Sequence, residues 1–520
     1  MHSEYRSTGK KGENAMNKKK LFVIAGIGIL LCLSVMTQTT PALDLFDGKV
    51  VIHGKITESY LRRAHGREPY ELYDYETINA RSSFKLETMW HAYSGSEYQI
   101  NLYGVFKEFY DAAGDIDGDT GRYLDWGGGG HARKEFRSYD SAKDIIREAY
   151  LEVNHNLFQV RLGKQIVSWG ETSFERMVDN INPVDARGNL NPAYPDFAEI
   201  KRGLWMGRFF FTPRDVPMDL NFELLLIPDF EPTRQWPVGY HLLHPSSFNS
   251  FKHPNDQFRA YYRDQPNDGF NKMEIGLRVR GFLKGWDWTA SYFRHRADDG
   301  VLRTGKAIAS VLPSLTGKGH AKNVWHYGWQ DSFGLTFNRP VDVRIPIIPG
   351  TTLAMSGNIF RFEGLWEHSK DGTEFLGSNV RVKEYNRYAF CARWDTKIFI
   401  PGLTPWARNK YLSSGTQLFM EFIPEKHRTD YIYPWVTYGK KHKHWTVITE
   451  ELSYELWNGR ILPGFYGAYY VDHGGGYWAP ALGFKPFFKW TFMIRYINYF
   501  DLQPELNRKD FWTGEIVYEF

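Results

Sequence analysis

The sequence predicts an all-β fold, a transmembrane antiparallel barrel of about eighteen strands with sixteen as the alternative count, and three observations predict it. Segments of about 10–14 residues alternate polar and apolar side chains, which is the period of a strand. Connections between these segments alternate between short and long. The outward sets are rich in Trp, Tyr and Phe, as membrane-interface girdles require, and this favours a membrane barrel over a soluble sandwich.

Residues 1–42 read as an N-terminal extension followed by a cleavable signal peptide. A basic stretch at 17–20 precedes an apolar run at 21–35, and Thr40-Pro-Ala42 supplies small residues for cleavage. We therefore expect export and a mature chain at 43–520 that forms the barrel. A second apolar run long enough for a transmembrane helix does not occur in this mature sequence.

Period-two alternation defines each expected strand. In the run from Tyr98 to Phe106 the apolar side chains oppose Gln99 and Asn101. The expected strands are 49–62, 79–93, 97–111, 144–153, 157–170, 203–212, 217–227, 272–283, 286–296, 328–338, 351–366, 384–397, 411–423, 443–457, 460–471, 477–485, 487–500 and 511–520.

Connections after even-numbered strands are generally short, apart from two middling links at 339–350 and 398–410, and are expected to be periplasmic turns. The long connections that follow odd-numbered strands are expected to be extracellular loops, at 63–78, 112–143, 171–202, 228–271, 297–327, 367–383 and 424–442.

The stretch 147–171 is the most informative hairpin. Its two arms alternate around an Asn154-His155-Asn156 turn, but the alternation changes after Gly163, where Lys164 falls on the apolar parity. This predicts a bulge near the glycine. The segment that follows contains Pro183 and further prolines, which are too many for a regular helix or strand. It also contains several short polar side chains.

Three pieces of this region resemble the signature of the domain of unknown function 1302 family of Gram-negative outer-membrane β-barrel proteins. They are 161–171, 180–185 and the charged approach 199–201. The motif residues are Gly163, Lys164, Gln165, Trp169, Gly170 and Glu171. The resemblance implies a porin-like barrel in the outer membrane, surrounded by lipid and lipopolysaccharide.

The last ten residues alternate and end on Phe520. An alternating strand closed by a terminal Phe resembles the C-terminal recognition signal of outer-membrane barrels. We therefore expect the barrel-assembly machinery to be a partner that recognises Phe520.

A barrel of 16–18 strands encloses an aqueous lumen, whose charges set selectivity. We expect a channel, not an enzyme, for passive passage or export of small polar or anionic solutes. The expected pore-lining charges are Lys85, Glu87, Arg161, Arg278, Arg280, Arg387, Arg393, Lys489 and Arg495. Pairing of these charges with one another is the alternative to an anionic cargo.

The third long loop, 172–201, is expected to fold inward and constrict the pore. Its prolines limit its freedom, and short polar side chains can hold turns. The constriction residues are expected to be Asn180, Asn182, Pro183 and Asp185.

Two further functional classes remain open. The barrel could be a sleeve or partner in a transport or electron-transfer complex, beside an efflux or cytochrome partner; the sequence has no Cys-x-x-Cys-His motif, so we expect no cofactor of its own. An outer-membrane hydrolase would need a Ser/His arrangement, which the loop at 241–247 could supply.

A metal site and nucleic-acid binding have less support. Asp115, Asp117 and Asp119 offer alternating carboxylates for Ca²⁺ but lack the spacing of an EF-hand, so a plain acidic loop competes with a metal site. The net charge of +4 is small and the basic residues are scattered, which argues against nucleic acid.

Overall fold

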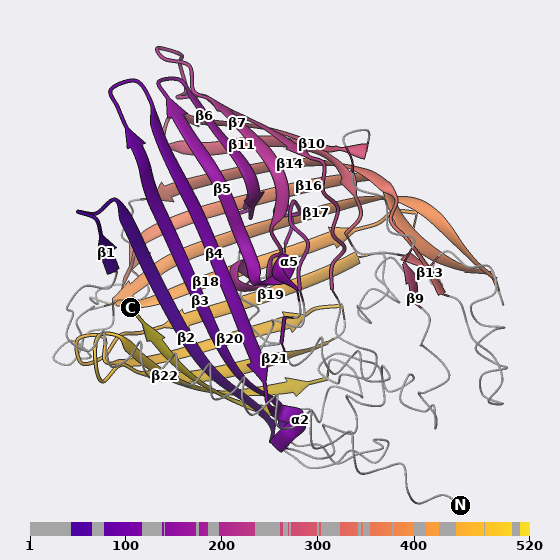
Figure 1. The fold of residues 1–520 in the computed structure, drawn as a ribbon. Coiled ribbons are helices and arrows are strands. Elements are labelled where there is room, and N and C mark those ends of the chain that lie inside the picture. The colour runs from indigo at the N-terminus through magenta and orange to yellow at the C-terminus, as the bar shows by residue number, and fades with distance from the viewer. Residues whose placement is uncertain are drawn as a thin grey trace, which may run out of the picture.

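The chain forms one large antiparallel barrel in a computed structural model (Figure 1). The structure describes residues 43–64, 77–116, 138–139, 141–172, 176–185, 197–234, 261–263, 269, 272–298, 301–302, 323–341, 345–346, 354–376, 379–399, 411–425, 444–472, 474–501 and 510–520.

Eighteen strands of the described residues pair in sequence order around the barrel. They are β2 (Val50–Arg63), β3 (Thr77–Ser94), β4 (Gln99–Asp111), β5 (Ile146–His155), β6 (Phe158–Gln165), β7 (Leu204–Phe211), β8 (Asn221–Ile227), β10 (Glu274–Leu283), β11 (Trp286–Arg296), β14 (Trp329–Val341), β16 (Ala354–Leu376), β17 (Asn379–Phe399), β18 (Tyr411–Phe422), β19 (His444–Ser453), β20 (Ile461–Tyr470), β21 (Gly475–Phe484), β22 (Trp490–Phe500) and β23 (Phe511–Glu519). Two short strands, β1 (Leu43–Leu45) and β15 (Ile345–Pro346), extend the same sheet.

The barrel closes because its first and last long strands pair. β2 and β23 are antiparallel from Lys55 opposite Glu519 to Arg63 opposite Phe511. Closure leaves no free edge between the long strands, so every strand of the wall has hydrogen-bonding neighbours on both sides. The predicted eighteen-stranded antiparallel barrel is confirmed.

The largest differences from the predicted strand boundaries are at the end of β6 and in the hairpin of β16 and β17. β6 ends at Gln165 instead of residue 170, because the chain after it leaves the wall. The predicted loop 367–383 is wrong: β16 continues to Leu376 and β17 begins at Asn379, with a register shift between Glu367 and Lys370. This hairpin arm extends past the neighbouring strands (Figure 1). It therefore does not need the apolar alternation by which the wall strands were recognised.

The two faces of the wall differ as the alternation predicts. Outward residues include Leu277, Leu335 and Leu482, which are among the exposed large apolar side chains. Aromatic rings stack across neighbouring strands on this face, with Phe333 and Trp366 4.9 Å apart between centroids. Apolar and aromatic side chains outside, with polar groups inside, are the arrangement of an outer-membrane barrel.

Short turns join the strands at one end. The β10–β11 turn has positive φ at Lys284 (49°) and Gly285 (84°), the conformation of a two-residue hairpin turn. No helix in the described part of the chain is both long enough and apolar enough to cross a membrane.

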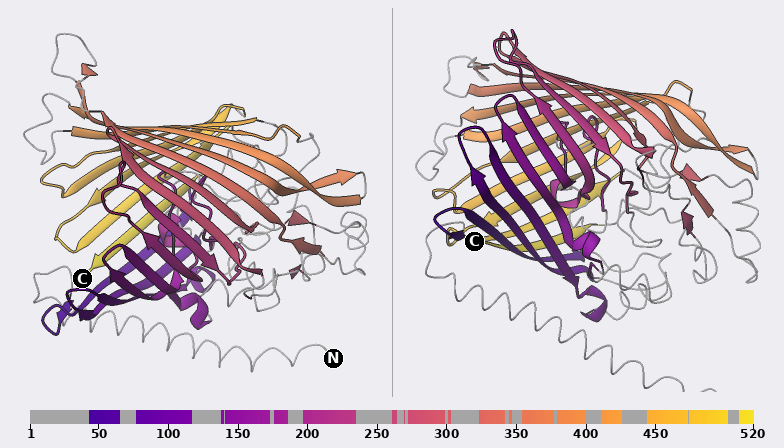
Figure 2. Two further views of the ribbon diagram at one scale, coloured as in Figure 1. Left: turned by 90° about the horizontal axis from the view of Figure 1, so that it is seen from above. Right: turned by 45° about the horizontal axis from the view of Figure 1, so that its top comes forward.

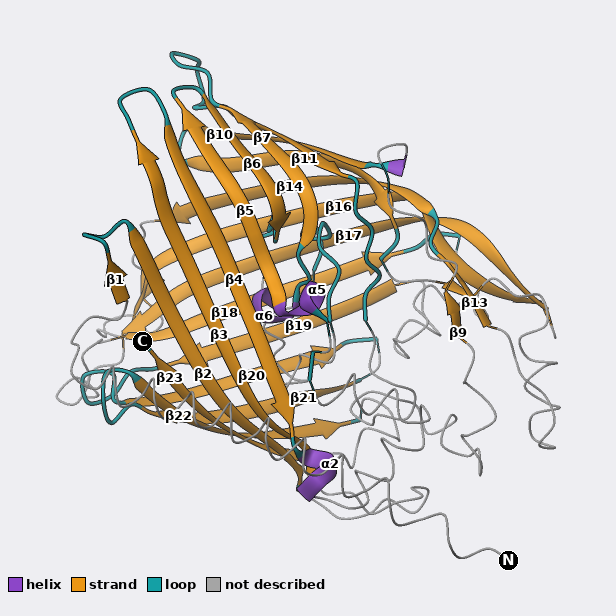
Figure 3. Ribbon diagram, in the orientation of Figure 1, coloured by secondary structure: helices purple, strands orange, loops and turns teal. Residues whose placement is uncertain are grey.

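Within the described residues, three short helices and a small sheet lie outside the wall pairing. The helices are α2 (Ala113–Ile116), α5 (Ala142–Ile145) and α6 (Phe197–Ile200), and the sheet joins β9 (Tyr261–Arg263), β12 (Val301–Leu302) and β13 (Asn323–His326). α5 and α6 are seen between the near and far walls of the barrel in Figure 3, and the two rotated views in Figure 2 show the strands surrounding this region.

Phe520 lies at the closing seam. Its backbone N–H donates to the Gly54 carbonyl (2.9 Å), and the Gly54 N–H donates to its carbonyl (2.7 Å). The Phe520 ring occupies the space above Gly54, where a Cβ would lie 1.9 Å from the ring. The terminal residue therefore has a structural contact in the barrel, in addition to its expected role in recognition.

Candidate functional site

The site is built by the chain between β6 and β7, residues 166–203, called the motif loop below. Near the end of β6, Gly163 has a φ of 138°, a conformation that side chains rarely adopt. A Cβ at this position would lie 2.3 Å from the Ala149 carbonyl oxygen. The predicted bulge is wrong, because the pairing of β6 with β5 and β7 runs without a register shift.

Side chains of the motif then hold the start of the loop. Lys164 donates to the carbonyls of Ile146 (2.8 Å) and Lys143, and Gln165 donates to the Met206 carbonyl (3.2 Å). Both side chains are buried. Both side chains bind backbone carbonyls near the point where the chain leaves the sheet. Carbonyl groups there would otherwise lack hydrogen-bond partners.

Trp169 fixes the loop to the inner face of the wall. Its indole N–H donates to Glu223 on β8 (3.2 Å), and the Arg278 guanidinium lies 5.4 Å from its ring. The ring packs over Gly276, where a Cβ would lie 2.8 Å from it, and makes an edge contact with Phe293. Because these partners lie on β8, β10 and β11, one side chain joins the loop to three strands.

Apolar packing extends this attachment. Met177, Val178 and Ile181 are at most 2% exposed and belong to one buried cluster with Leu225 and Phe293. We call these five residues with Trp169 the apolar anchor. A barrel interior is usually polar. This side of the lumen therefore resembles the core of a soluble domain.

Glu171 and Glu363 make a polar contact beside the apolar anchor. Glu363 on β16 accepts hydrogen bonds from the backbone N–H groups of Glu171 and Thr172, the latter at 2.8 Å. Glu171 pairs with Arg361 (3.1 Å) and accepts from Asn338 (3.0 Å). These contacts join the motif loop to β14 and β16.

Gly170 lies beside the contact between Glu171 and Glu363, and a Cβ at this position would be 2.9 Å from the Asp179 side chain. With Glu171, it completes the six family-motif residues. Four of the six make side-chain contacts, and the two glycines, Gly163 and Gly170, have no space for a side chain.

The four expected constriction residues lie in or beside the described turn of the motif loop. Asn182 is fully buried: its side chain accepts from the Val167 N–H (2.7 Å) and donates to the carbonyls of Gln165 and Arg202. Asn180 donates to Ser332 on β14 (3.0 Å).

The other two expected constriction residues pair with the returning chain. The Pro183 carbonyl accepts from the Arg202 N–H at 2.7 Å, and the Asp185 N–H donates to the Ile200 carbonyl at the same distance. The middle of the motif loop is therefore held to its returning end by backbone bonds.

Glu199 on α6 attaches the loop to a different part of the wall. Its carboxylate pairs with Lys85 on β3 (3.1 Å), Lys107 on β4 (2.8 Å) and Arg147 on β5 (3.2 Å). Burial raises the pKa of this carboxyl, but the three cations outweigh burial and hold the pKa well below its usual range. We call Glu199 with these three residues the ionic clamp.

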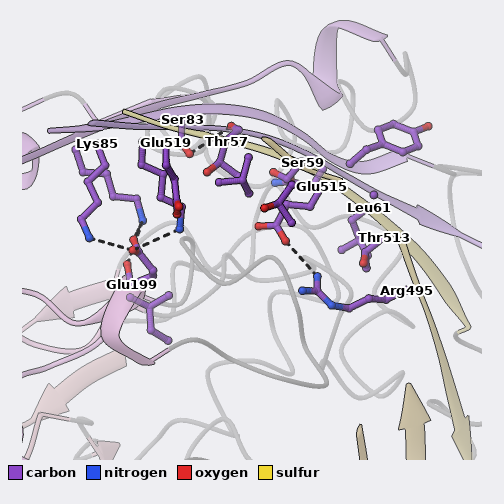
Figure 4. A pocket seen from close by; sticks show the side chains of 18 of the residues that line it. Thr57, Ser59, Leu61, Ser83, Lys85, Glu199, Arg495, Thr513, Glu515 and Glu519 are labelled. Carbon is purple, nitrogen blue, oxygen red and sulfur yellow. Dashed lines mark hydrogen bonds and ion pairs between the residues drawn. The ribbon is translucent and has the colours of Figure 1, made fainter. Parts of the chain in front are cut away.

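A cavity of about 370 Å³ lies between α6 and the inner face of β2, β3, β22 and β23 (Figure 4). Five basic and three acidic side chains line it, which leaves two net positive charges. They are Lys55, Lys85, Lys107, Lys485, Arg495, Glu199, Glu515 and Glu519. Hydroxyl groups of Thr57, Ser59 and Ser83 lie between them. We call this space the side cavity.

Most of the expected pore-lining cations lie in ion pairs. The pairs are Arg161–Glu152, Arg278–Glu223, Arg280–Asp287, Arg387–Glu367, Arg387–Glu421, Arg393–Asp395, Arg393–Glu451, Arg495–Glu515 and Lys85–Glu87. Only Lys85 and Arg495 of these line the side cavity. Lys489 lies in the turn before β22 instead of within a strand.

Sequence reasoning missed Lys55 and Lys485 in the side cavity, and it named Glu199 only as part of a family motif. Lys55 shares the inward parity of Thr57 and Ser59, so the alternation of β2 contained this signal. Basic side chains from three strands converge on Glu199 because of the path of the motif loop. A local sequence pattern does not encode this convergence.

Other candidate residues are only partly described. Asp115 accepts a hydrogen bond from Tyr110 (2.6 Å), while Asp117, Asp119, His241, His244, Ser246 and Ser247 lie outside the described residues. Within the described ranges, no three His, Cys, Asp or Glu side chains form a group that could hold a metal ion.

Fold and faces define a porin-like outer-membrane β-barrel, and the protein is located in the Gram-negative outer membrane. Residues 67–388 match the model of a family described as "Protein of unknown function (DUF1302)", and the chain belongs to this family. The resemblance noted in the motif is thereby confirmed. No curated protein matches the sequence.

Several solved structures are similar in fold. OccAB2 of Acinetobacter baumannii is 10% identical, with 91% of this chain and 98% of that chain covered and a TM-score of 0.47. The outer membrane protein OpdK of Pseudomonas aeruginosa is 9% identical, with 91% and 98% covered and a TM-score of 0.46. A BenF-like porin of Pseudomonas fluorescens is 7% identical, with 91% and 98% covered and a TM-score of 0.44. At these values the similarity carries no argument about function.

Proposed function

We propose that this protein is an outer-membrane channel for the passive passage of small polar solutes, with a modest preference for anions. The motif loop is proposed to constrict the lumen, and solutes pass it through the side cavity. Passage is driven by the concentration gradient, so the same path serves uptake or export.

The observation that carries the proposal is that the apolar packing of the motif loop and the side cavity lie at different parts of the wall. Its apolar anchor contacts strands β8 and β11, while the side cavity lies at β2, β3, β22 and β23. Charged and hydroxyl side chains line this space. Polar lining groups can replace part of the hydration of a solute without holding it in one place.

The anion preference rests on the side cavity and not on the number of arginines in the lumen. Arg387 and Arg393 each pair with two carboxylates, and Arg278 shares Glu223 with Arg208, so most of this arginine charge is offset within the wall. The two net positive charges of the side cavity support a preference that is weak and sensitive to salt.

The alternative of a sleeve around a partner protein is less well supported. Trp169 and Glu199 attach the motif loop to inward side chains on two parts of the wall, at β8 and at β4. A partner threaded through the barrel would need this space. Interactions with lipopolysaccharide, and recognition of Phe520 by the assembly machinery, are proposed as for other barrels of this class.

The experiment is conductance of the purified full-length protein in planar bilayers. We expect discrete channels whose reversal potential in a salt gradient indicates weak anion preference, and a band that shifts on heating in detergent gels because the closed barrel resists unfolding. A heat-modifiable barrel without conductance would refute the channel. Recovery of the protein in the soluble periplasmic fraction would refute the membrane barrel itself.

A further inference from the structure

We propose that Glu199 sets the charge selectivity of the pathway by neutralising a cationic cluster that would otherwise face the side cavity. This inference rests on the proposed channel function and deepens it by naming the residue and the class of solute. The favoured solutes are singly charged anions and uncharged polar molecules, and multivalent anions are disfavoured.

The geometry places one carboxylate among three cations. Both Glu199 oxygens are used: Oε1 contacts Lys85, and Oε2 contacts Lys107 and Arg147. Lys55 lies 4.0 Å from Oε1 and also lines the side cavity. A multivalent anion entering this region would meet at least four basic groups if Glu199 carried no charge.

Selectivity by charge requires attraction that is strong enough to admit a solute and weak enough to release it. With Glu199 ionised, the lining of the side cavity carries two net positive charges, and without this charge it carries three. The carboxylate therefore limits how strongly a multivalent anion is held. The attraction of a singly charged anion changes less, because its Coulomb energy scales with its own charge.

The position of the motif loop does not depend on Glu199 alone. The apolar anchor is buried, and Asn182 bonds to both ends of the loop. Arg147 also donates to the carbonyls of Ala198 (2.7 Å) and Lys201 (3.1 Å), contacts that remain if the carboxylate is lost. A change of charge at Glu199 is thus expected to alter the electrostatic field in the side cavity more than the position of the motif loop.

The test compares Glu199→Gln with the double variant Glu199→Gln and Lys107→Gln, in planar bilayers under a potassium chloride gradient. For Glu199→Gln we expect the anion-over-cation permeability ratio to rise about fourfold, because one more unit positive charge about 10 Å from an ion in water favours an anion about twofold and disfavours a cation about twofold. The double variant restores the net charge and should return the ratio close to that of the natural protein. Blocking by sulfate added to one side should become stronger in Glu199→Gln alone.

Glu450→Gln is the matched control. Glu450 accepts hydrogen bonds from Ser414 (2.7 Å) and Thr416 (2.6 Å), and it does not line the side cavity. We expect no shift in its permeability ratio.

An unchanged ratio in a conducting Glu199→Gln channel would overturn the inference and leave the channel function standing. A second outcome is that the double variant fails to restore the permeability ratio and that both variants have a several-fold larger conductance. This would show that Glu199 acts only by holding the loop. Absence of conductance in the natural protein would instead refute the channel function on which the inference rests.

Discussion

The motif loop meets the barrel at two places with opposite chemistry. Against β8 and β11 it buries Trp169, Met177, Val178 and Ile181 in an apolar cluster. Against β3, β4 and β5 it is attached by one carboxylate among three cations. Apolar packing depends on shape and is almost independent of salt, whereas ion pairs depend on charge and are screened by salt.

This difference separates two tasks. The apolar anchor is expected to determine where the loop lies, because deep burial of several side chains contributes several kcal/mol. The ionic clamp contributes less to position, since a partly exposed ion pair is worth about 1 kcal/mol or less. The clamp instead determines the field in the side cavity. The predictions below test this division, beginning with the largest effect.

The largest effect is expected from shortening the motif loop. Deleting Asn180 to Pro195 should raise single-channel conductance several-fold, because the proposed constriction is lost while the eighteen wall strands remain. The measurement is conductance in planar bilayers, together with heat-modifiable mobility to show that the barrel is intact. Unchanged conductance with an intact barrel would place the loop outside the conducting path.

A single substitution should break the apolar anchor alone. Val178 is 2% exposed and packs against Gly334 on β14, so Val178→Asp would bury a carboxylate without a partner, at a cost of several kcal/mol. We expect a larger and more variable conductance than that of the natural protein, with charge selectivity reduced because the passage is wider. Val471→Asp, at an exposed site, is the control and should conduct normally.

The outcome for Val178→Asp also decides between the two attachments. If its conductance equals that of the natural protein, the ionic clamp alone is enough to position the loop. The division of tasks would then be wrong.

The wall of this barrel could be predicted from sequence because each strand contains its own evidence. Alternation in β4 or β23 reports which side chains face lipid, and no distant residue is needed to interpret it. The predicted and observed strands correspond one to one, including the β10–β11 turn at Lys284 and Gly285. The arm of β16 and β17 beyond the wall was missed, because alternation is not required where the strands leave the lipid.

The site could be predicted only in part, for a physical reason. Parity identified Arg278 and Arg387 as inward, but the carboxylates that pair with them lie on neighbouring strands, and their net effect depends on register. The role of Trp169 depends on Gly276, a residue 107 positions later in the sequence. Contacts of a long loop are set by tertiary structure, which local patterns do not encode.

The smallest expected effect is that of acid on the ionic clamp. A carboxyl whose pKa is lowered in the folded state contributes stability that is fully present above its ordinary pKa and is lost as the pH falls through the lowered value. The pKa of Glu199 lies below its ordinary value of 4.5, because Lys107, Lys85 and Arg147 favour the charged form more than burial opposes it. The clamp should therefore persist when the pH is lowered from 7 to about 4, where an ordinary glutamate is largely protonated. Single-channel conductance should stay constant over this range, and the permeability ratio of the natural protein should stay below that of Glu199→Gln at each pH. Convergence of the two ratios near pH 4.5 would mean that Glu199 titrates as an ordinary glutamate and that the three cations do not hold it in the charged form.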